Sequence, residues 1–137
     1  ISTLAVGIMQ RALDEAVAYA KQRKQFGRRL IDFEMVQAML ADMAIKTEAA
    51  RVLGNNCMRQ MDAGEMVRKD GAIVKTFVTD AMQEVVSNAV QVLGGYGYSE
   101  EYPVEKLMRD AKIFQIFEGS NQIQRMTIAK ELDREYR

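Results

Sequence analysis

Residues 67–98 read VRKDGAIVKTFVTDAMQEVVSNAVQVLGGYGY, and this stretch decides the fold class. Its apolar residues recur every three or four positions, which is the spacing of one face of an α-helix. The expected inward face consists of Val74, Val78, Ala81, Val85, Ala89 and Val92. Three glycines within residues 94–97 follow it, and glycine commonly ends a helix. The stretch therefore predicts a long helix from about residue 67 to residue 93.

The same spacing recurs on both sides of this stretch. It predicts one helix from the start to about residue 24 and another from about residue 32 to residue 63. A short helix is expected after Pro103, because proline suits a first helical turn. A last helix is expected after residues 119–121. No alternation of period two is sustained, so no sheet is expected. The prediction is an all-α fold, an antiparallel bundle of the four-helix type.

The buried face of each flanking helix follows from the same pattern. In the first helix the predicted inward residues are Leu4, Ile8, Ala12, Ala16 and Tyr19. In the second they are Phe33, Val36, Leu40, Met43, Thr47, Ala50, Cys57 and Met61. In the last they are Ile123, Met126 and Leu132. Nearly half of the residues are apolar, which is enough for one continuous core within a single domain.

Composition excludes several classes of function. The 19 basic and 19 acidic residues balance, which argues against a nucleic-acid surface. No apolar run approaches the length of a membrane span. The chain has no histidine, which excludes Ser-His-Asp and Cys-His catalysis and histidine-ligated zinc, and no metal site is expected. The single cysteine, Cys57, cannot form an internal disulfide, which fits a reducing compartment.

Two segments near helix ends are candidates for binding. Residues 23–27 read RKQFG, where Arg23 could complement a helix dipole or could hold a phosphate while Phe26 covers a flat ring. Residues 91–98 read QVLGGYGY, where three glycines permit close approach to the backbone. A helix end alone explains one or two of those glycines. The spacing alone leaves both readings of each segment open.

A third segment, residues 113–122, reads IFQIFEGSNQ and is the candidate for proton chemistry. Glu118 follows an apolar and aromatic run, and apolar surroundings raise the pKa of a carboxyl group. Gly119 would let a substrate come close, and the N–H groups of the following helix could hold an anion. The alternative is that Glu118 only complements the dipole of that helix.

The stretch QVLGGYGYSEEYPVEKLMRDAKIFQIFEGSNQIQR, residues 91–125, resembles the acyl-CoA dehydrogenase family. That family carries a Gly-Gly-x-Gly-[Tyr/Phe] loop, then Glu-Tyr-Pro, Arg-Asp-Ala and Glu-Gly-[Thr/Ser] before a final helix. The upstream RKQFG and the LADM of residues 40–43 also match, so the resemblance covers essentially all 137 residues. It is nearest to the short- and medium-chain straight-chain members. The resemblance implies that residues 1–137 are the single C-terminal helical domain of a longer enzyme, without its N-terminal helical and middle β domains.

The resemblance also implies an activity and its partners. The whole enzyme would use FAD to oxidise a fatty acyl-CoA to the trans-2-enoyl-CoA, and the fragment alone would be inactive. An electron-transferring flavoprotein would accept the electrons, and the enzyme would be a homo-oligomer, a dimer or a tetramer. The implied location is the bacterial cytoplasm or the mitochondrial matrix. The alternative is a non-catalytic module that only associates with itself. A member that lost oxidation and kept ligand binding is disfavoured by the intact Glu118-Gly119 pair.

Family roles transfer to individual positions. Glu118 matches the catalytic base that takes the α-proton, and Gly119 matches a substrate contact. The positions implied to bind the cofactor are Arg23, Phe26, Gln91, Val92, Leu93, Gly94, Gly95, Ser120, Asn121 and Gln122. Residues of the Arg23 and Gln91 type reach the cofactor of a neighbouring subunit in the family. Glu34 departs from the usual Gln and could weaken a cofactor contact, while Arg109 and Asp110 are interpreted as structural pairing.

Overall fold

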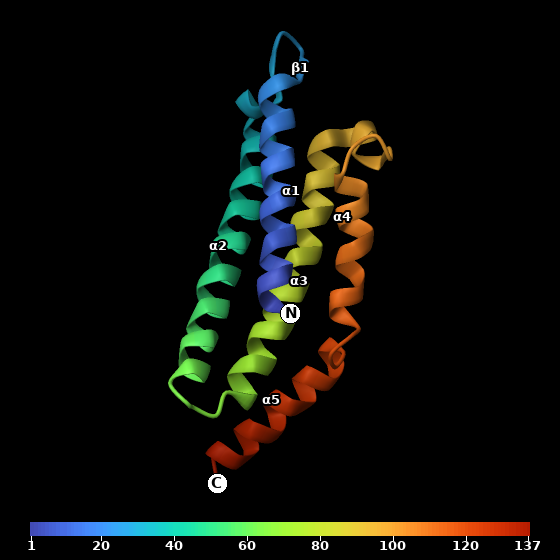
Figure 1. Ribbon diagram of the computed structural model, residues 1–137. Coiled ribbons are helices and arrows are strands. Elements are labelled where there is room, and N and C mark those ends of the chain that lie inside the picture. Colours follow the sequence, from blue (N-terminus) through green and yellow to red (C-terminus); the bar gives the residue numbers. More distant parts are fainter.

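The longest apolar stripe of the sequence forms the centre of the molecule. The computed structural model describes residues 1–137, and its helix α3 (Arg68–Leu93) contacts all four other helices: α1 (Ser2–Gln22), α2 (Glu34–Asp62), α4 (Val104–Ala111) and α5 (Asn121–Glu135). Helices α1 to α4 run alternately up and down, and α5 turns away across the lower end of α3 (Figure 1). The predicted all-α antiparallel bundle is confirmed.

The core lies between α1, α2 and α3. All six residues predicted to face inward from α3 are buried. Helix α1 presents mostly alanine there, which lets the helices approach closely, and Met9, Met43 and Met82 fill the remaining space, as flexible thioether side chains do in irregular gaps. The predicted face of α2 is buried from Leu40 to Cys57, whereas Met61 in its last turn is exposed.

Two further predicted faces differ from the structure, that of α1 in part and that of α5 entirely. Leu4 is exposed, and Ala5 and Met9 are buried, because one residue of offset turns a helix face by about 100°. The three residues predicted to face inward from α5, Ile123, Met126 and Leu132, are all exposed, because within this chain α5 packs mainly against α3. The one buried residue of α5 is Asn121.

The expectation of no sheet is also corrected at one place. Strands β1 (Lys24–Gln25) and β2 (Arg28–Arg29) form a two-stranded antiparallel hairpin above the α1 end of the bundle (Figure 1). Strands of two residues are too short to produce a visible alternation. Short 3-10 turns at Leu30–Asp32, Gly94–Tyr98 and Lys112–Gln115 complete the connections.

The structure contains no helix with the length and apolarity needed to cross a bilayer. It also contains no cluster of three metal-binding side chains.

Candidate functional site

The first two candidate segments meet at one end of the bundle. Helix α1 ends at Gln22, and Arg23 continues in an extended conformation beside the end of α3. Between them is an open groove of about 560 Å³. The groove is lined by Tyr19, Arg23, Gln25, Leu30, Val92, Leu93, Gly94, Gly95, Tyr96, Ser99 and Glu101. Residues distant in sequence, Arg23 and the glycine-rich segment, therefore form one surface.

Arg23 is oriented by an aromatic ring. Its guanidinium carbon lies 5.6 Å from the centroid of the Tyr96 ring, and Tyr96 packs against Tyr19 and Tyr102 with centroids 6.4 and 5.6 Å away. Such stacking leaves the in-plane N–H donors of a guanidinium available. No carboxylate lies within ion-pair distance of Arg23. Glu101 also lines the groove, but Arg23 forms no direct ion pair, so its oriented guanidinium is available to a phosphate.

Phe26 stands at the tip of the β1–β2 hairpin. Phe26 and Gly27 form its two-residue turn with φ values of 52° and 80°. Tight hairpin turns require such a pair of positive values, but a bulky side chain rarely adopts one. Phe26 is 93% exposed, and its ring lies edge-on to the ring of Phe33, with centroids 6.4 Å apart. An exposed ring in a strained turn is an aromatic surface available to a partner.

The remaining residues of the glycine-rich segment differ in exposure. Gln91, Gly94 and Gly95 are exposed, while Val92 and Leu93 are mostly buried and contribute to the groove wall. A side chain added at Gly94 or Gly95 would meet no atom within 4 Å, so open space lies above both. The backbone here is accessible to another group, as the sequence predicted.

Glu118 lies near the opposite end of the bundle, on the loop between the 3-10 turn Lys112–Gln115 and α5. Its φ is 54°, and Gly119 follows with a φ of 83°. Phe26 and Glu118 are the two residues other than glycine with a positive φ, and both were sequence candidates. Strained conformations of this kind concentrate at functional sites.

The carboxylate of Glu118 is not enclosed by this chain. Phe114 and Phe117 pack edge-on with centroids 5.0 Å apart on the inner side of the loop, and Glu118 is exposed. The apolar surroundings predicted from the neighbouring residues therefore do not form within residues 1–137. Any apolar wall around the carboxylate has to come from outside them.

The main chain around Glu118 is held by side chains from two helices. Gln124 Nε2 of α5 donates to the Glu118 carbonyl oxygen at 3.1 Å, and Lys75 Nζ of α3 donates to the Gly119 carbonyl oxygen at 2.8 Å. Ser120 caps α5, and its hydroxyl oxygen accepts from the Ile123 N–H. The loop is thus fixed at and just after its most strained residue.

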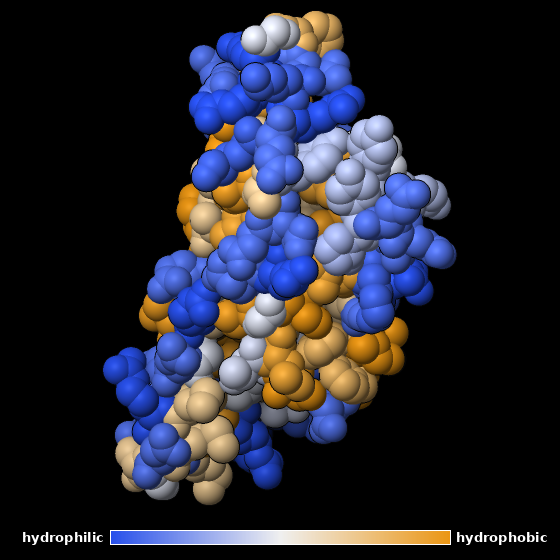
Figure 2. All heavy atoms as spheres, turned by 45° about the horizontal axis from the view of Figure 1, so that its top comes forward, coloured by the Kyte–Doolittle hydropathy of each residue, from blue (hydrophilic) through white to orange (hydrophobic).

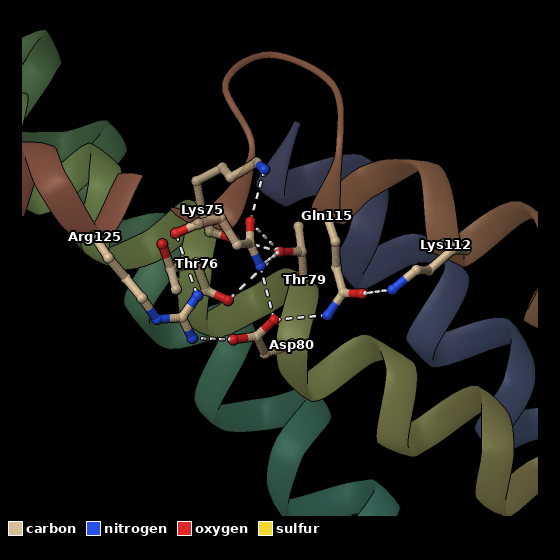
Figure 3. A network of polar contacts seen from close by, with 8 residues as sticks. Lys75, Thr76, Thr79, Asp80, Lys112, Gln115 and Arg125 are labelled. Atoms are coloured by element: carbon tan, nitrogen blue, oxygen red, sulfur yellow. Dashed lines mark hydrogen bonds and ion pairs between the residues drawn. The ribbon is translucent and has the colours of Figure 1, made fainter. Parts of the chain in front are cut away.

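Asn121 connects this loop to a polar network on α3, in which Lys75, Thr79 and Asp80 are labelled in Figure 3. Its side chain is 2% exposed. Its Oδ1 accepts from Lys75 Nζ at 2.7 Å, and its Nδ2 donates to Thr79 Oγ1 at 2.8 Å and to Asp80 Oδ1 at 2.7 Å. The amide of Asn121 is directed into the chain and occupied there, so a cofactor could reach only its main chain. Ser120 is half-buried and Gln122 is exposed.

Asp80 completes the network. Its carboxylate accepts from Arg125 Nη2 at 2.6 Å and from Gln115 Nε2 at 2.7 Å (Figure 3). Burial alone would raise the pKa of Asp80, but the hydrogen bonds from Arg125, Gln115 and Asn121 hold the pKa of that carboxyl below its ordinary value. The pKa of Lys75 is lowered, because burial disfavours its ammonium form.

Sequence reasoning did not find Lys75, Thr79 and Asp80. Their signal was weak but present, since Lys75 and Thr79 are polar residues on the otherwise apolar face of α3, at the four-residue spacing that places side chains side by side. Two other sequence candidates lie on the surface. Glu34 is the exposed first residue of α2, and Arg109 and Asp110 each pair with the residue four positions earlier in α4, as structural pairing predicts.

The two candidate areas are well separated. Lys75 lies toward the end of α3 that is near the Glu118 loop, and Val92 lies at the other end, beside the groove. The rise along the helix between these two residues is about 26 Å, at roughly 1.5 Å per residue. A single copy of the chain therefore does not bring the groove and the carboxylate together.

Comparison with known proteins gives consistent matches over nearly the whole chain. The family model described as Acyl-CoA dehydrogenase, C-terminal domain, matches residues 1–132. A probable acyl-CoA dehydrogenase of Mycobacterium tuberculosis is 50% identical over 133 residues, which are 96% of this chain and 34% of the relative. The caffeyl-CoA reductase-Etf complex subunit CarC of Acetobacterium woodii is 43% identical over 129 residues, 94% of this chain and 34% of the relative.

Solved structures agree. Butyryl-CoA dehydrogenase from Megasphaera elsdenii superimposes with a TM-score of 0.94 at 46% identity, over 96% of this chain and 34% of that chain. The chain thus spans about a third of the length of the proteins it matches.

Proposed function

This chain belongs to the acyl-CoA dehydrogenase family, as its C-terminal domain, and on that basis we propose that the full-length protein is a FAD-dependent acyl-CoA dehydrogenase with Glu118 as its base. Its reaction would convert a fatty acyl-CoA into the trans-2-enoyl-CoA. The observation that carries the proposal is Glu118 itself. It is an exposed carboxylate, held in a strained conformation by bonds from two helices, and directly followed by glycine.

The residues at the groove fit a flavin dinucleotide. Arg23 offers a guanidinium without a direct ion-pair partner in the groove, and Phe26 offers an exposed ring at the tip of the adjoining hairpin. These groups suit a phosphate and a flat ring system. Gly94 and Gly95 leave open space above the backbone, which permits close approach. FAD, when bound, supplies the oxidant that accepts the β-hydrogen of the substrate as hydride. Because the groove and Glu118 are far apart, the groove of one copy would serve the active site of another, which supports a homo-oligomer.

The chain's own part in the reaction is proton transfer. The carboxylate of Glu118 takes the α-proton of the acyl thioester, and the electron pair of that C–H bond becomes the second bond of the new double bond. Gly119 has no side chain to obstruct the substrate beside the base. Its φ of 83° lies in the left-handed region, which only glycine adopts without strain. The N–H groups at the start of α5 lie next to this position and can polarise an acyl oxygen.

An electron-transferring flavoprotein is the proposed electron acceptor. Its support is the relative in Acetobacterium woodii, which is named as a subunit of a reductase-Etf complex. Matched relatives are named for different acyl groups, including butyryl-CoA and cyclohexane-1-carbonyl-CoA.

Replacement of the base tests the proposal. We expect Glu118→Gln in the full-length enzyme to keep FAD and acyl-CoA binding, because amide and carboxylate have the same shape. Flavin bleaching by saturating acyl-CoA should slow by a factor of about 100 to 10,000, as is usual for loss of a general base. Rapid-mixing absorbance measures this rate.

The matched control is Glu65→Gln, which changes an exposed glutamate in the α2–α3 connection. It should leave the rate unchanged. If Glu118→Gln reduces its flavin as fast as the unmodified enzyme does, the base lies on another residue.

A further inference from the structure

The carbonyl oxygens of Glu118 and Gly119 accept hydrogen bonds from donors of different kinds. The Glu118 carbonyl oxygen accepts a hydrogen bond from the neutral side-chain amide of Gln124, six residues later in the chain. The Gly119 carbonyl oxygen accepts a hydrogen bond from the ammonium of Lys75 at 2.8 Å, from a residue 44 positions earlier in the chain, and a longer one from Gln124 Nε2 at 3.4 Å. Hydrogen bonds from a charged donor are roughly twice as strong as neutral ones. Lys75 is therefore the stronger and the more distant of the two anchors.

The environment of Lys75 is unusual for a residue that only stabilises the fold. Lys75 is 6% exposed, yet its ammonium donates to two neutral oxygens, of Gly119 and of Asn121, and no carboxylate lies within ion-pair distance. A buried cation without a paired anion costs free energy. Burial lowers the pKa of Lys75 for the same reason. A methionine of similar length would fill this space without that cost, so the ammonium has a local task.

The ammonium of Lys75 acts at the strained turn that Glu118 and Gly119 form. Glu118 has a φ of 54°, in a region that L-residues adopt only when their surroundings enforce it. Gly119 is equally far from helical geometry, and α5 begins two residues later. Without the Lys75 ammonium, the Gly119 carbonyl oxygen would keep only the 3.4 Å hydrogen bond from Gln124, so the Gly119–Ser120 peptide group could rotate and Glu118 could relax toward a favoured φ. Its side chain would then leave the loop in another direction.

We propose that Lys75 is a positioning residue for the base: by holding the Gly119 carbonyl oxygen, it fixes the direction in which the Glu118 carboxylate faces the substrate. The inference rests on the proposed function of Glu118. Lys75 itself does not touch the reacting atoms. Thr79 Oγ1 donates to the Lys75 carbonyl oxygen at 2.8 Å and accepts from the Asn121 amide, so the anchor is continuous with the network in Figure 3.

The test isolates proton abstraction from hydride transfer. An acyl-CoA analogue with sulfur in place of the β-carbon can lose its α-proton but has no β-hydride to give. Exchange of its α-hydrogens in D2O, followed by mass spectrometry on the FAD-loaded full-length enzyme, reports the base alone. The dissociation constant of the same analogue reports binding.

Lys75→Met removes the ammonium and keeps the length of the side chain. We expect exchange to slow by about 100-fold, the order of loss for a catalytic group misplaced by about 1 Å, with the dissociation constant within about 3-fold. Lys75→Arg restores a cation and should recover much of the exchange. Lys69→Met is the matched control, because Lys69 also joins α3 to α5, by a 2.6 Å ion pair with Glu135, but does not touch the loop. The Lys69→Met enzyme should exchange the α-hydrogens of the analogue as fast as the unmodified enzyme does.

Each other outcome has a definite meaning. Unchanged exchange in Lys75→Met overturns the proposal. The proposal is also overturned if Lys75→Met and Lys75→Arg both lose FAD binding, analogue binding and exchange together. That result would assign Lys75 to folding. Glu118→Gln is measured in parallel: if it exchanges normally, the base assignment fails whatever Lys75 does.

Discussion

At the scale of single residues, the glycine-rich segment serves two different purposes. Gly94 and Gly95 lie under open space, as a binding surface requires. Gly97 is buried, and a Cβ atom there would lie 2.5 Å from the Val90 carbonyl oxygen and 3.0 Å from Leu93 Cβ. The sequence predicted close approach of another group to this backbone. At Gly97 the group that approaches is the preceding turn of the chain itself.

Substitution by alanine should therefore destabilise the domain at Gly97 and have little effect at Gly95. Gly97→Ala forces backbone atoms apart and should destabilise the domain by about 1–3 kcal/mol, the usual cost of overpacking. Gly95→Ala, two residues away, should change stability by less than about 0.5 kcal/mol. Thermal unfolding of the two variants measures both. Equal melting temperatures would show that the packing at Gly97 is looser than described.

Sequence reasoning selected Glu118 because residue types and their order are local information. It could not give the conformation of Glu118 or the role of Lys75. The bond from Lys75 joins residues 44 positions apart, and such a contact depends on how α5 packs against α3.

At the scale of elements, α5 is attached by polar contacts more than by apolar ones. Its single buried residue is Asn121, and its bonds to α3 run through Asn121, Arg125 and two ion pairs near its end. Helix α5 should therefore be the helix whose stability responds most to the charge of Asp80.

The contribution of the Asp80 carboxylate to the stability of α5 should decrease in acid. The pKa of Asp80 is lowered by folding from its ordinary value of 3.8. Its contribution is therefore complete above that unfolded value and is lost as the pH falls below it through the folded pKa. We expect Asp80→Asn to loosen α5 at neutral pH. The difference between variant and unmodified protein should shrink as the pH falls below about 4 and through the lowered pKa of Asp80. Amide hydrogen exchange of α5, corrected for the intrinsic effect of pH, measures it.

Asp133→Asn is the control, because Asp133 forms only an exposed pair with Arg137, and such pairs contribute little. A difference for Asp80→Asn that persists unchanged at low pH would contradict the assignment.

The ends of the helices were well predicted from the sequence, and their buried faces were predicted less well. The helix ends at residues 22, 62 and 93 lie within two residues of prediction, because basic and glycine residues mark them locally. The face of α5 was wrong, because periodicity shows an apolar stripe but not which molecule covers it. The hairpin was missed because a two-residue strand has no period.

At the scale of the whole molecule, apolar side chains reach the surface in broad patches (Figure 2). One open hollow is formed by α2 with Phe77 of α3 and is lined by Ile45, Glu48, Ala49, Val52, Leu53, Asn56, Arg59 and Phe77. Large apolar surfaces of this kind mark contacts with other molecules. The location of the groove far from Glu118 independently favours more than one copy.

The 137-residue chain on its own should therefore self-associate. Static light scattering at high micromolar concentration should give a mass above the 15.5 kDa of one copy. Ile45→Lys with Val52→Lys should shift the mass toward one copy, because buried lysines oppose association. Met66→Lys, which changes an isolated exposed methionine outside the hollow, should not. A single-copy mass for the unmodified chain would refute the prediction.

The central place of α3 has a consequence for how the domain folds and breaks. Since α3 contacts every other helix, neither the α1–α2 pair nor the α4–α5 segment can bury its apolar side chains without it. Met9 of α1 and Met43 of α2, for example, are fully buried in the core that includes residues of α3. The domain should accordingly unfold as one cooperative unit rather than from one end. A protease cut in the α2–α3 connection would leave two pieces that are each incomplete and that regain structure only by complementing one another.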